Sequence, residues 1–573
     1  MALHRGKSGS PTALPVGALQ GAGGRCRHRR RGLVLVVVLI MITLLSLLAA
    51  SYSFMVRSHV ATVHSNYHSF QARMAAESGF QRAIVMLRES RGDVDSWLDN
   101  PEEFQHLLVF GTEGQDEIES RSDAETYDPM ASEAWRVNLV HADLDERDKV
   151  RYGIIDEGAR LNLNTATDAQ LRRFFEAAIP TSDPDNPVDI DMLADSLLDW
   201  REAGATPREN GAKDDYYMNL RPAYRCKKGP FVTVEELLLV RGFTGWVVFG
   251  EDYNRNGLLD PNEDDGNESF PPDDANNSLF PGVARYFTVW SREMNMSNDN
   301  RARINLNLRD TQKLQELLEE DFGGDIVSYV MQVRSSGGRF NSVMNLLPAP
   351  PTPEQEEEEV IEEESESSTL PPTSQPDSQG ADGNDEGLGG GSSDPNQAQP
   401  ESENRATPRL PEYKDLTAEP PPGGVDDLPV ILDRLTVFPL PVLGGRININ
   451  TAPREVLASI EALTDEQLDA IVAARPTLQS DDKATPAWLL TQDVIDEYTF
   501  RRIIDGLTTS SSAYRVEAIG YADHLGVVRR INTVFEMRGP IAQVLYRRDL
   551  TSLGPAFNPY GEERRELGNG SDQ

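Results

Sequence analysis

The residues best placed to do chemistry lie in the stretch EDYNRNGLLDPNE, residues 251–263. Six of them can each offer an oxygen atom to a metal ion. An EF-hand calcium loop carries its oxygen ligands at positions 1, 3, 5, 7, 9 and 12 and a glycine at position 6, where the chain bends sharply. Position 6 is Gly257, and position 7 has to supply only a backbone carbonyl. The ligand positions hold Asp252, Asn254, Asn256, Leu258, Asp260 and Glu263. The sequence therefore predicts a bound Ca²⁺, and the alternative is an uncoordinated, polar surface loop.

The segments that flank this loop do not favour a calcium sensor, because a sensor needs a helix on each side. The helical stretch VEELLLV ends at Arg241–Gly242, and the residues that follow Glu263, DDGNESFPPDDANNS, have no helical pattern. A turn of helix is expected only at Pro261, where Asp260 and Glu263 form a capping box. In an exported protein, a site with a Kd of about 10⁻⁴ to 10⁻³ M would stay filled. We therefore expect a structural calcium ion.

No other pattern in the sequence indicates catalysis. There is no P-loop, HExxH, GxSxG or dinucleotide-binding glycine fingerprint. His64 and His68 are spaced like two metal ligands on one helix face, but no third ligand lies near them in sequence. Cys226 has neither a paired base nor, once the leader with Cys26 is removed, a second cysteine. We predict that the protein is not an enzyme and has no catalytic residues.

The charge of the chain argues against nucleic acid as a partner. The 573 residues carry a formal net charge of −38, whereas binding to phosphates needs a surplus of Lys and Arg in a patch. Part of the excess lies in EQEEEEVIEEESESS (354–368), which has nine glutamates and no basic residue. This run is part of a Pro, Ser, Gly and Gln-rich segment, which predicts a disordered linker.

The N-terminal part of the sequence predicts a membrane anchor. RCRHRRR (25–31) and Gly32 precede an uncharged apolar run of 18 residues, Leu33–Ala50. As a helix, this run would be about 27 Å long, which is enough to cross the apolar core of a bilayer. The basic residues place the N-terminus in the cytoplasm and the remainder of the chain on the other side. A secretory signal peptide and a plain signal anchor are the alternatives.

The helical pattern continues beyond the apolar run, which disfavours a signal peptide. No proline occurs between Pro15 and Pro101. Apolar residues recur at spacings of three and four, first from Val60 to Met74 and then, after a shift, from Phe80 to Leu87. The sequence therefore predicts one helix of more than 50 residues, apolar in its first half and amphipathic in its second half.

A short phrase occurs three times, and each copy predicts an alternating strand followed by a helix. The asparagine–threonine pairs at 164–165 and 450–451 stand where a helix N-cap is expected. The third copy continues with LTDEQLDAIVAARP, a second helix. The copies are ARLNLNTATDAQLRRFFEAA from Ala159, ARINLNLRDTQKLQELLEE from Ala302 and GRININTAPREVLASIEAL from Gly445.

Pairs of helices of this kind also occur in helix-hairpin-helix DNA-binding domains, which gives an alternative function. Such domains bring glycine-rich backbone close to phosphate. The connection between the two helices of the third copy is EALTDEQ, which has acidic residues and no glycine. A membrane-anchored DNA-binding or DNA-uptake protein therefore remains the second hypothesis.

The chain resembles a known class of membrane-anchored proteins. The basic leader, the glycine and a helix ending in AAESGFQRAIVML resemble the type IV pilins and pseudopilins. The co-linear phrases DEGARLNLNTA (156–166), DDYYMNLRPAYRCKKGPFVTVEELLLVRG (214–242), GRININTAPREVLASI and AYRVEAIGYADHLGVVRRINTVFEMRG (513–539) resemble the minor pseudopilin K family of type II secretion systems. The middle repeat, the calcium-type loop and the acidic linker are departures from that pattern.

The resemblance implies how the protein is processed and what it binds. A prepilin peptidase would cut between Gly32 and Leu33, and mature position 5, usually glutamate in the class, is Val37, as is typical of pseudopilin K. The protein would be a single-pass inner-membrane protein with its bulk in the periplasm. It would lie at the pseudopilus tip with I- and J-like minor pseudopilins and initiate assembly. Calcium has a structural role in this family. A minor pilin of a type IV pilus is a third hypothesis.

The expected fold is α+β: a long N-terminal transmembrane spine helix, a small antiparallel sheet and inserted helical modules of SAM or helix-hairpin-helix type. Strands are predicted within 135–158 and 513–539, with a hairpin turn near Leu525–Gly526. In residue numbers, we expect a leader at 1–32, the spine helix at 33–91, pilin-like strands with the first module at 92–250, the calcium-type loop at 251–275, the second module at 276–347, the acidic linker at 348–428, the third module with C-terminal strands at 429–550 and a tail at 551–573.

Overall fold

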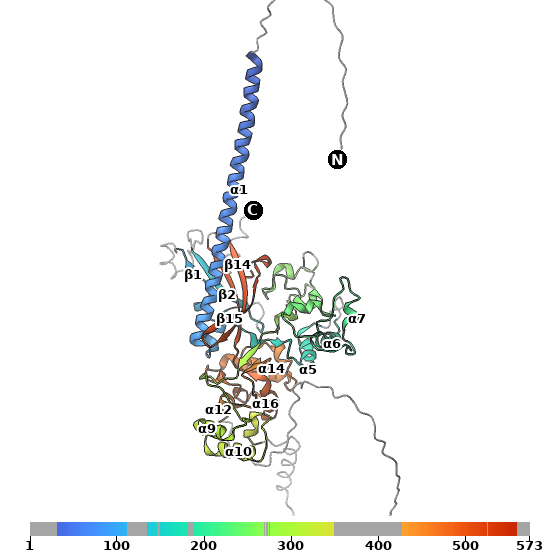
Figure 1. Cartoon of the computed structure of the whole chain (residues 1–573), viewed down its shortest axis with the longest axis vertical. Coiled ribbons are helices and arrows are strands. Elements are labelled where there is room, and N and C mark those ends of the chain that lie inside the picture. The colour runs from blue at the N-terminus through green and yellow to red at the C-terminus, as the bar shows by residue number, and fades with distance from the viewer. Residues whose placement is uncertain are drawn as a thin grey trace, which may run out of the picture. The chain divides into compact units, whose positions relative to one another are not determined.

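The computed structural model describes most of the chain outside the leader and the linker (Figure 1). The described residues are 31–111, 134–145, 149–180, 188–266, 268, 270, 273, 275–348, 427–523 and 525–557. The basic leader up to residue 30, nearly all of the acidic linker and most of the tail lie outside them. The chain divides into one unit that ends at His68 and a second unit that begins at Ser69.

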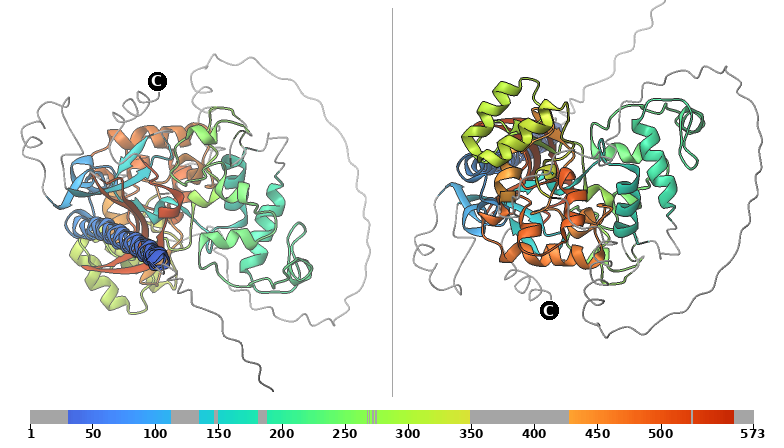
Figure 2. Two further views of the ribbon diagram at one scale, coloured as in Figure 1. Left: turned by 90° about the horizontal axis from the view of Figure 1, so that it is seen from above. Right: turned by 90° about the horizontal axis from the view of Figure 1, so that it is seen from below.

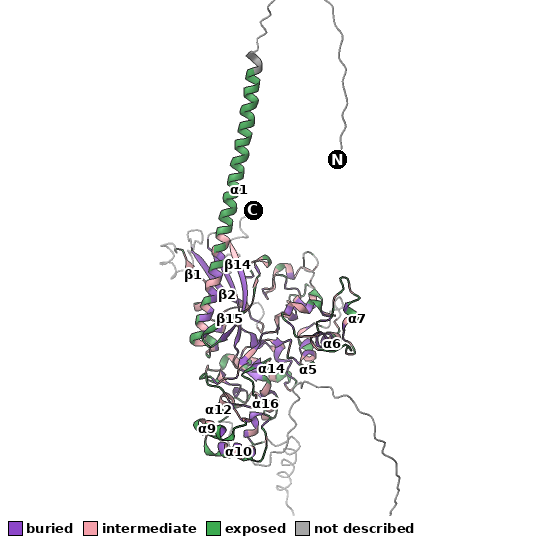
Figure 3. Ribbon diagram, viewed as in Figure 1, coloured by how far each residue is buried: buried purple, intermediate pink, exposed green. Residues whose placement is uncertain are grey.

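Helix α1 (Arg31–Ser90) is 60 residues long, which confirms the prediction of one helix of more than 50 residues. Among the described residues, it is the one helix that is long and apolar enough to cross a membrane. The apolar side chains from Val34 to Leu48 are exposed (Figure 3). A surface of this composition is stable in lipid and costly in water.

The second unit contains a seven-stranded sheet in the order β1-β2-β13-β14-β15, in which β3 pairs with β2 and β4 with β13. Each of these pairings is antiparallel, which confirms the strands predicted in both regions. The predicted hairpin turn is also present, with Gly526 at φ +60° between β13 and β14. The strands are β1 (Leu107–Phe110), β2 (Trp135–Ala142), β3 (Val150–Tyr152), β4 (Ile155–Asp156), β13 (Ala513–Ala522), β14 (Val528–Arg538) and β15 (Ile541–Asp549).

The amphipathic end of α1 packs on this sheet. Phe80, Ile84 and Leu87 are buried in one hydrophobic cluster with Phe535 of β14. The rings of Phe80 and Phe535 meet edge to face, with 5.2 Å between their centroids. Two short helices follow α1, namely α2 (Val94–Leu98) and α3 (Pro101–Phe104).

The three copies of the repeated phrase form three modules between β4 and β13. Each copy begins with a two-residue strand that pairs in parallel with a strand far along the chain, and this second strand ends in threonine. Each threonine hydroxyl accepts a hydrogen bond from the amide two residues further on. The ladders join β5 (Leu161–Asn162) to β6 (Phe287–Thr288), β8 (Ile304–Asn305) to β9 (Leu435–Thr436) and β11 (Ile447–Asn448) to β12 (Leu507–Thr508).

Helices fill the space between the two strands of each ladder. In both views of Figure 2, the helices of the first module and those of the second form separate groups. The first module contains α5 (Asp168–Ala178), α6 (Ile190–Arg201), α7 (Asp214–Tyr217), η2 (Val234–Leu239), α8 (Gly245–Phe249), η3 (Pro261–Glu263) and η4 (Val283–Arg285). The second contains α9 (Thr311–Asp321), α10 (Gly324–Ser335), η5 (Val343–Leu346) and α12 (Leu428–Arg434). The third contains α13 (Arg454–Leu457), α14 (Asp465–Ala474), η7 (Arg475–Thr477), η8 (Asp482–Ala484), α15 (Trp488–Thr491), α16 (Glu497–Ile503) and η9 (Ile504–Gly506).

The prediction that the asparagine–threonine pairs at 164–165 and 450–451 cap helices is wrong. The cap of α5 is Thr167, whose hydroxyl accepts a hydrogen bond from the amide of Gln170 at 3.2 Å in a capping box. Helix α13 begins after Pro453. A threonine three residues further on satisfies the first amides of α5, so the asparagine is free for another role.

That role is to hold a distant part of the same module. Asn164 accepts a hydrogen bond from the amide of Phe231 at 2.7 Å and donates one to the carbonyl of Phe231 at 3.0 Å. Asn307 makes the same two bonds with Phe340, at 2.9 and 2.8 Å. In each case one side-chain amide satisfies a backbone donor and a backbone acceptor that would otherwise be left unpaired.

An arginine occupies a similar place in each module. It lies in the last turn of the second helix or directly after that helix, and it donates to backbone carbonyls just after the first strand of the ladder. These bonds run from Arg201 to Leu163 and Ala166 (both 2.6 Å), from Arg334 to Leu308 (3.0 Å) and from Arg475 to Ile449 (2.8 Å).

Asn450 makes the corresponding clamp in the third module, and its removal should destabilise the protein. It donates to the carbonyl of Lys483 at 2.8 Å and accepts from the buried indole of Trp488 at 3.0 Å. Asn450→Ala leaves both groups buried without a partner. We expect the free energy of unfolding to fall by about 1 to 3 kcal/mol.

The measurement is urea unfolding followed by tryptophan fluorescence, and Asn341→Ala is the matched control. Asn341 is exposed in the second module, and its backbone amide, which the substitution keeps, makes the hydrogen bond to Asn345. If both variants unfold at the same urea concentration, the clamp contributes nothing to stability.

Candidate functional site

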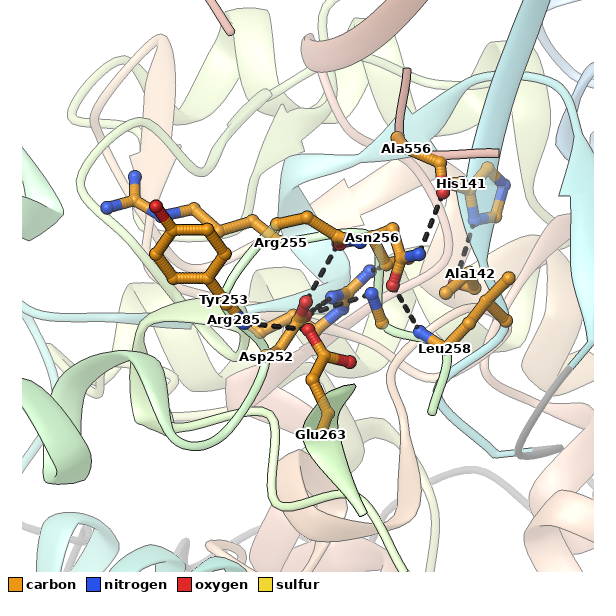
Figure 4. A network of polar contacts seen from close by, with 12 residues as sticks. His141, Ala142, Asp252, Tyr253, Arg255, Asn256, Leu258, Glu263, Arg285 and Ala556 are labelled. Carbon is orange, nitrogen blue, oxygen red and sulfur yellow. Dashed lines mark hydrogen bonds and ion pairs between the residues drawn. The ribbon is translucent and has the colours of Figure 1, made fainter. Parts of the chain in front are cut away.

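The predicted calcium loop lies in the first module between α8 and η4. The sequence did not predict α8, a five-residue helix that ends two residues before Glu251. Three of the predicted ligands are almost fully buried, with Asp252 and Asn256 each 2% exposed and Glu263 1% exposed. Figure 4 shows the side chain of Glu263 directed toward the start of the loop at Asp252 and Tyr253, and the side chain of Asn256 directed toward Ala556 and Leu258.

The carboxylate of Asp252 organises the bend. It accepts hydrogen bonds from the backbone amides of Asn256 and Gly257, both at 2.9 Å. The guanidinium of Arg285 donates to it at 2.8 Å. Burial raises the pKa of Asp252, and the positive charge of Arg285 opposes that rise.

The amides of Asn254 and Asn256 both turn to Asp260. Their Nδ2 atoms donate to Oδ2 of Asp260 at 2.7 and 2.9 Å. Nδ2 of Asn256 also donates to the carbonyl of Ala556 at 2.7 Å, so the loop is fixed to the segment that follows β15. Positions 1, 3, 5 and 9 of the predicted ligand pattern are therefore connected by hydrogen bonds.

Glu263, at position 12, returns to the start of the loop. Its carboxylate accepts from the amide of Tyr253 at 2.9 Å and from the amide of Asp260 at 3.2 Å. The turn predicted at Pro261 is present as η3. Burial, together with the negative charges of Asp252 and Asp260, raises the pKa of Glu263 to about 7. Three carboxylates thus lie near enough to repel one another.

The position of Leu258 is set by both its backbone and its side chain. Its amide donates to Oδ1 of Asn256 at 2.7 Å, and its side chain packs against a small cluster that includes Val140 and Phe557.

In this structure, hydrogen-bond donors stand where a cation would lie. No group of three or more His, Cys, Asp and Glu side chains among the described residues is arranged to hold a metal ion. Two amide NH₂ groups point at Asp260, and the guanidinium of Arg285 lies on Asp252. Calcium binding would require both amides to rotate so that their oxygens replace their nitrogens. The side chains of the loop therefore contain the oxygen atoms that calcium needs. In this structure, however, the two asparagine amides present their nitrogen atoms to Asp260.

The sequence analysis did not identify Arg285, which contacts the loop at three points. It donates to Asp252, donates to the carbonyl of Asn256 at 3.1 Å and lies against Gly257. Arg285 is 22 residues beyond Glu263, past a segment with no helical or strand pattern. No local signal in the sequence could have indicated its position.

The other predicted site is the cleavage point at the start of α1. Gly32 and Leu33 lie within the bounds of the helix, but their exposure and contacts are outside the described part of the structure. Val37 is 52% exposed. His64 and His68 stack on one another with 6.2 Å between ring centroids.

The connection between α13 and α14, which would meet phosphate in a DNA-binding hairpin, is hydrogen-bonded at two carbonyls to the first module. Arg173 of α5 donates to the carbonyls of Ala458 and Leu463, each at 3.1 Å. The backbone of this connection is thus bound to the first module, so this part of the structure does not favour DNA binding.

Two segments of the chain match sequence models of the family described as Type II secretion system (T2SS), protein K. The matches cover residues 159–248, in the first module, and residues 447–489, in the third. They confirm the resemblance to protein K for these two modules. The second module and the loop at 251–263 lie outside both matched segments.

A curated relative and a solved structure are also similar to this chain. Type II secretion system protein K of Pseudomonas aeruginosa is 30% identical over 115 residues, which are 19% of this chain and 34% of the relative. The chain thus spans about a third of the length of that relative. The crystal structure of the GspK-GspI-GspJ complex from the type 2 secretion system of enterotoxigenic Escherichia coli aligns with 85% of this chain and 99% of its own, at 11% identity and a TM-score of 0.34.

The contact between Gly257 and Arg285 leads to a prediction for the stability of the loop. Gly257 has φ +75°, and a Cβ added there would lie 2.3 Å from the guanidinium of Arg285. Backbone strain in Gly257→Ala should lower the free energy of unfolding by about 1 to 2 kcal/mol. Displacement of Arg285 by the added Cβ should lower it further.

Gly266→Ala is the matched control, because Gly266 also has φ +75° but has no atom within 4 Å of an added Cβ. Denaturant unfolding of both variants separates the cost of the backbone from that of the displaced arginine. An equal loss of stability in the two variants would mean that the position of Arg285 is unimportant.

Proposed function

We propose that this chain is a non-enzymatic minor pseudopilin of a type II protein secretion system. One observation carries the proposal: two protein K matches occur in order behind the one membrane-competent helix of the described chain. The matches cover part of the chain, so function and partners are inferences from that arrangement. The partners proposed are the I- and J-like minor pseudopilins, a prepilin peptidase and the inner membrane.

The proposed orientation has the N-terminus in the cytoplasm and the second unit in the periplasm. It is supported by the five arginines of RCRHRRR directly before the apolar helix. The peptidase would act at Gly32 on the cytoplasmic side.

A position at the tip of the filament is supported by Val37 and by the size of the inserted modules. A carboxylate in lipid is costly unless it is paired, for example with the N-terminus of a neighbouring subunit. The proposed subunit has valine at this place, so it makes no such pair. Three modules between β4 and β13 would also obstruct a subunit stacked above them.

Calcium in this proposal is a structural ion that fixes the acidic loop. Asp252, Asn254, Asn256, Asp260 and Glu263 would hold it with side-chain oxygens, and Leu258 would contribute its carbonyl. Burial, together with the negative charges of Asp252 and Asp260, raises the pKa of Glu263, and the charge of the ion would offset both effects. The burial of two carboxylates, Asp252 and Glu263, in one loop supports this role, and rotation of the two asparagine amides is the change that binding requires.

Processing by a prepilin peptidase is the test of the proposed function. When the full chain is produced with such a peptidase, the mature protein should begin at Leu33, as read by N-terminal sequencing. Gly32→Leu should keep the leader attached, because a bulky side chain replaces the small residue at the cut.

Gly24→Leu, a change at another glycine of the same leader, should be processed normally. A mature protein that begins at Met1, or at a conventional signal-peptidase site, would remove the pilin-class proposal. Co-purification of the processed protein with I- and J-like pseudopilins, rather than with pilus subunits, separates secretion from a type IV pilus.

The calcium proposal predicts a stability that depends on the ion. If the loop binds calcium only when folded, raising free calcium to ten times Kd should increase the free energy of unfolding by about 1.4 kcal/mol. Thermal unfolding in calcium and in chelator measures this difference. Asp252→Ala with Glu263→Ala should abolish it.

The control pair is Glu316→Ala with Glu319→Ala, which removes two exposed carboxylates from α9. This pair should keep the full response to calcium. A melting temperature that is the same in calcium and in chelator would refute the structural ion and leave the rest of the proposed function standing.

A further inference from the structure

A cavity of about 140 Å³ lies between the sheet and the first module. Its walls come from β13, β14 and β15 on one side and from η2, α8 and the loop after α8 on the other. The lining is both apolar and charged. Trp290, Phe249 and Phe557 supply apolar surface, and five arginines supply positive charge.

Most of the charged groups around this cavity form pairs. Each of the three carboxylates that line it, those of Glu235, Asp252 and Glu517, is bound to an arginine. A further arginine of the lining is bound to a fully buried glutamate. The pairs are Arg548 with Glu235 (2.6 Å), Arg285 with Asp252 (2.8 Å), Arg515 with Glu157 (2.6 Å) and Arg530 with Glu517.

Two cations of the lining, Arg160 and Arg255, have no ion-pair partner among the described residues. Arg160 Nε is buried and has no hydrogen-bond partner among the described residues. The guanidinium of Arg255 lies over the ring of Phe249, 3.9 Å from its centroid, and makes no ion pair within the described part of the chain. Burial, together with the charge of Arg515, lowers the pKa of Arg160 to about 9. An excess of two positive charges thus faces the cavity in a chain whose net charge is −38.

The repeats show what an arginine at this position binds. Arg160 directly precedes the first strand of its module, as Arg303 and Arg446 do in the other two. Both of these donate to the same buried carboxylate, that of Glu293, at 2.6 and 3.3 Å. Two of the three equivalent arginines therefore form an ion pair with a carboxylate of the protein itself. Arg160 forms none among the described residues: the charge of Glu157 attracts it, but that carboxylate is bound by Arg515.

We propose that this cavity binds a carboxylate on a short apolar stem, with Arg160 as its main ligand and Arg255 as a second cation. The ligand is a small organic acid or the side chain of an acidic residue of a partner protein. A buried cation without a partner is costly, and a carboxylate ligand would make with Arg160 the kind of bond that Glu293 makes with Arg303.

The size and walls of the cavity limit the ligand. A cavity of about 150 Å³ is large enough for benzene, so this one encloses about six non-hydrogen atoms of a ligand, and its opening to solvent leaves room for the remainder of a slightly larger molecule. The aromatic walls favour a carbon stem over a fully hydrated anion such as phosphate. Succinate is therefore a suitable probe, and its neutral diamide, succinamide, has nearly the same shape without charge.

The test uses the full chain in detergent with calcium at about 1 mM, so that the state of the neighbouring loop is constant. Succinate should raise the melting temperature of the wild-type protein, and succinamide should not. In calorimetric titration, Arg160→Met should bind succinate about tenfold more weakly or worse, because it loses a charge-assisted hydrogen bond.

Arg303→Met is the matched control, because it changes the same repeat position where Glu293 is the partner. It should lower stability but leave succinate affinity unchanged. Arg255→Met, which should also weaken binding, replaces Arg160→Met if that variant fails to fold.

A capped Ala-Glu-Ala peptide distinguishes the two sources of the carboxylate. Binding of the peptide at least as tightly as succinate assigns the site to a partner's side chain, and binding of succinate alone assigns it to a free acid. If neither probe binds, or if succinate and succinamide act equally on the wild-type protein, the proposal is wrong.

Discussion

The structure depends on one pairing, between β4 and β13, where the chain leaves the sheet and returns to it. Asp156 lies opposite Tyr514, and Ile155 lies opposite Arg515. More than 350 residues separate these partners, so the modules form an insertion whose two ends meet at one place. The cost of closing such a long connection rises only with the logarithm of its length, which makes a large insertion thermodynamically tolerable.

Two buried polar contacts secure the junction. The carboxylate of Glu157 binds Arg515 at 2.6 Å, and the carboxylate of Asp156 accepts from the side-chain Nδ2 of Asn448, in the first strand of the third module, at 2.5 Å.

Within the insertion, each module has to close itself, and its ladder of two residues per strand is too short to do so alone. The asparagine clamp and the arginine that caps the carbonyls after the first strand provide the remaining polar contacts. The second and third modules are then joined by the carboxylate of Glu293, which binds Arg303 and Arg446. A carboxylate that is 3% exposed is stable there because two guanidinium groups replace the water it has lost. The arginine at this repeat position therefore binds the second and third modules to the segment between the first and second modules, and in the first module it faces a cavity.

The features predicted correctly from the sequence were those that depend on neighbouring residues. Alternation predicted β13 and β14, and helical spacing predicted α1. Features that depend on distant residues could not be predicted in this way. Asn164 was interpreted as a cap because capping is a local rule, but its partner Phe231 is 67 residues away. The strand β6 that closes the first module contains only two residues and has no periodicity to detect. Arg285 and the leftover charge of Arg160 become visible only when the packing of the first module against the sheet is known.

The contact between the sheet and the loop at 251–263 decides what kind of site this loop can be. Arg530 of β14 is fully buried and donates to the carbonyls of Asn254 and Arg255, at 2.6 and 2.8 Å. Two successive peptide groups of the loop are thus fixed by a central strand of the sheet, and Asn256 is fixed to Ala556. A calcium sensor works because its loop can rotate the helices on either side of it. Here the preceding helix, α8, has five residues, and the loop itself is bonded to the sheet. An ion bound in this place could stabilise the contact between the first module and the sheet, but the loop has no freedom to act as a lever.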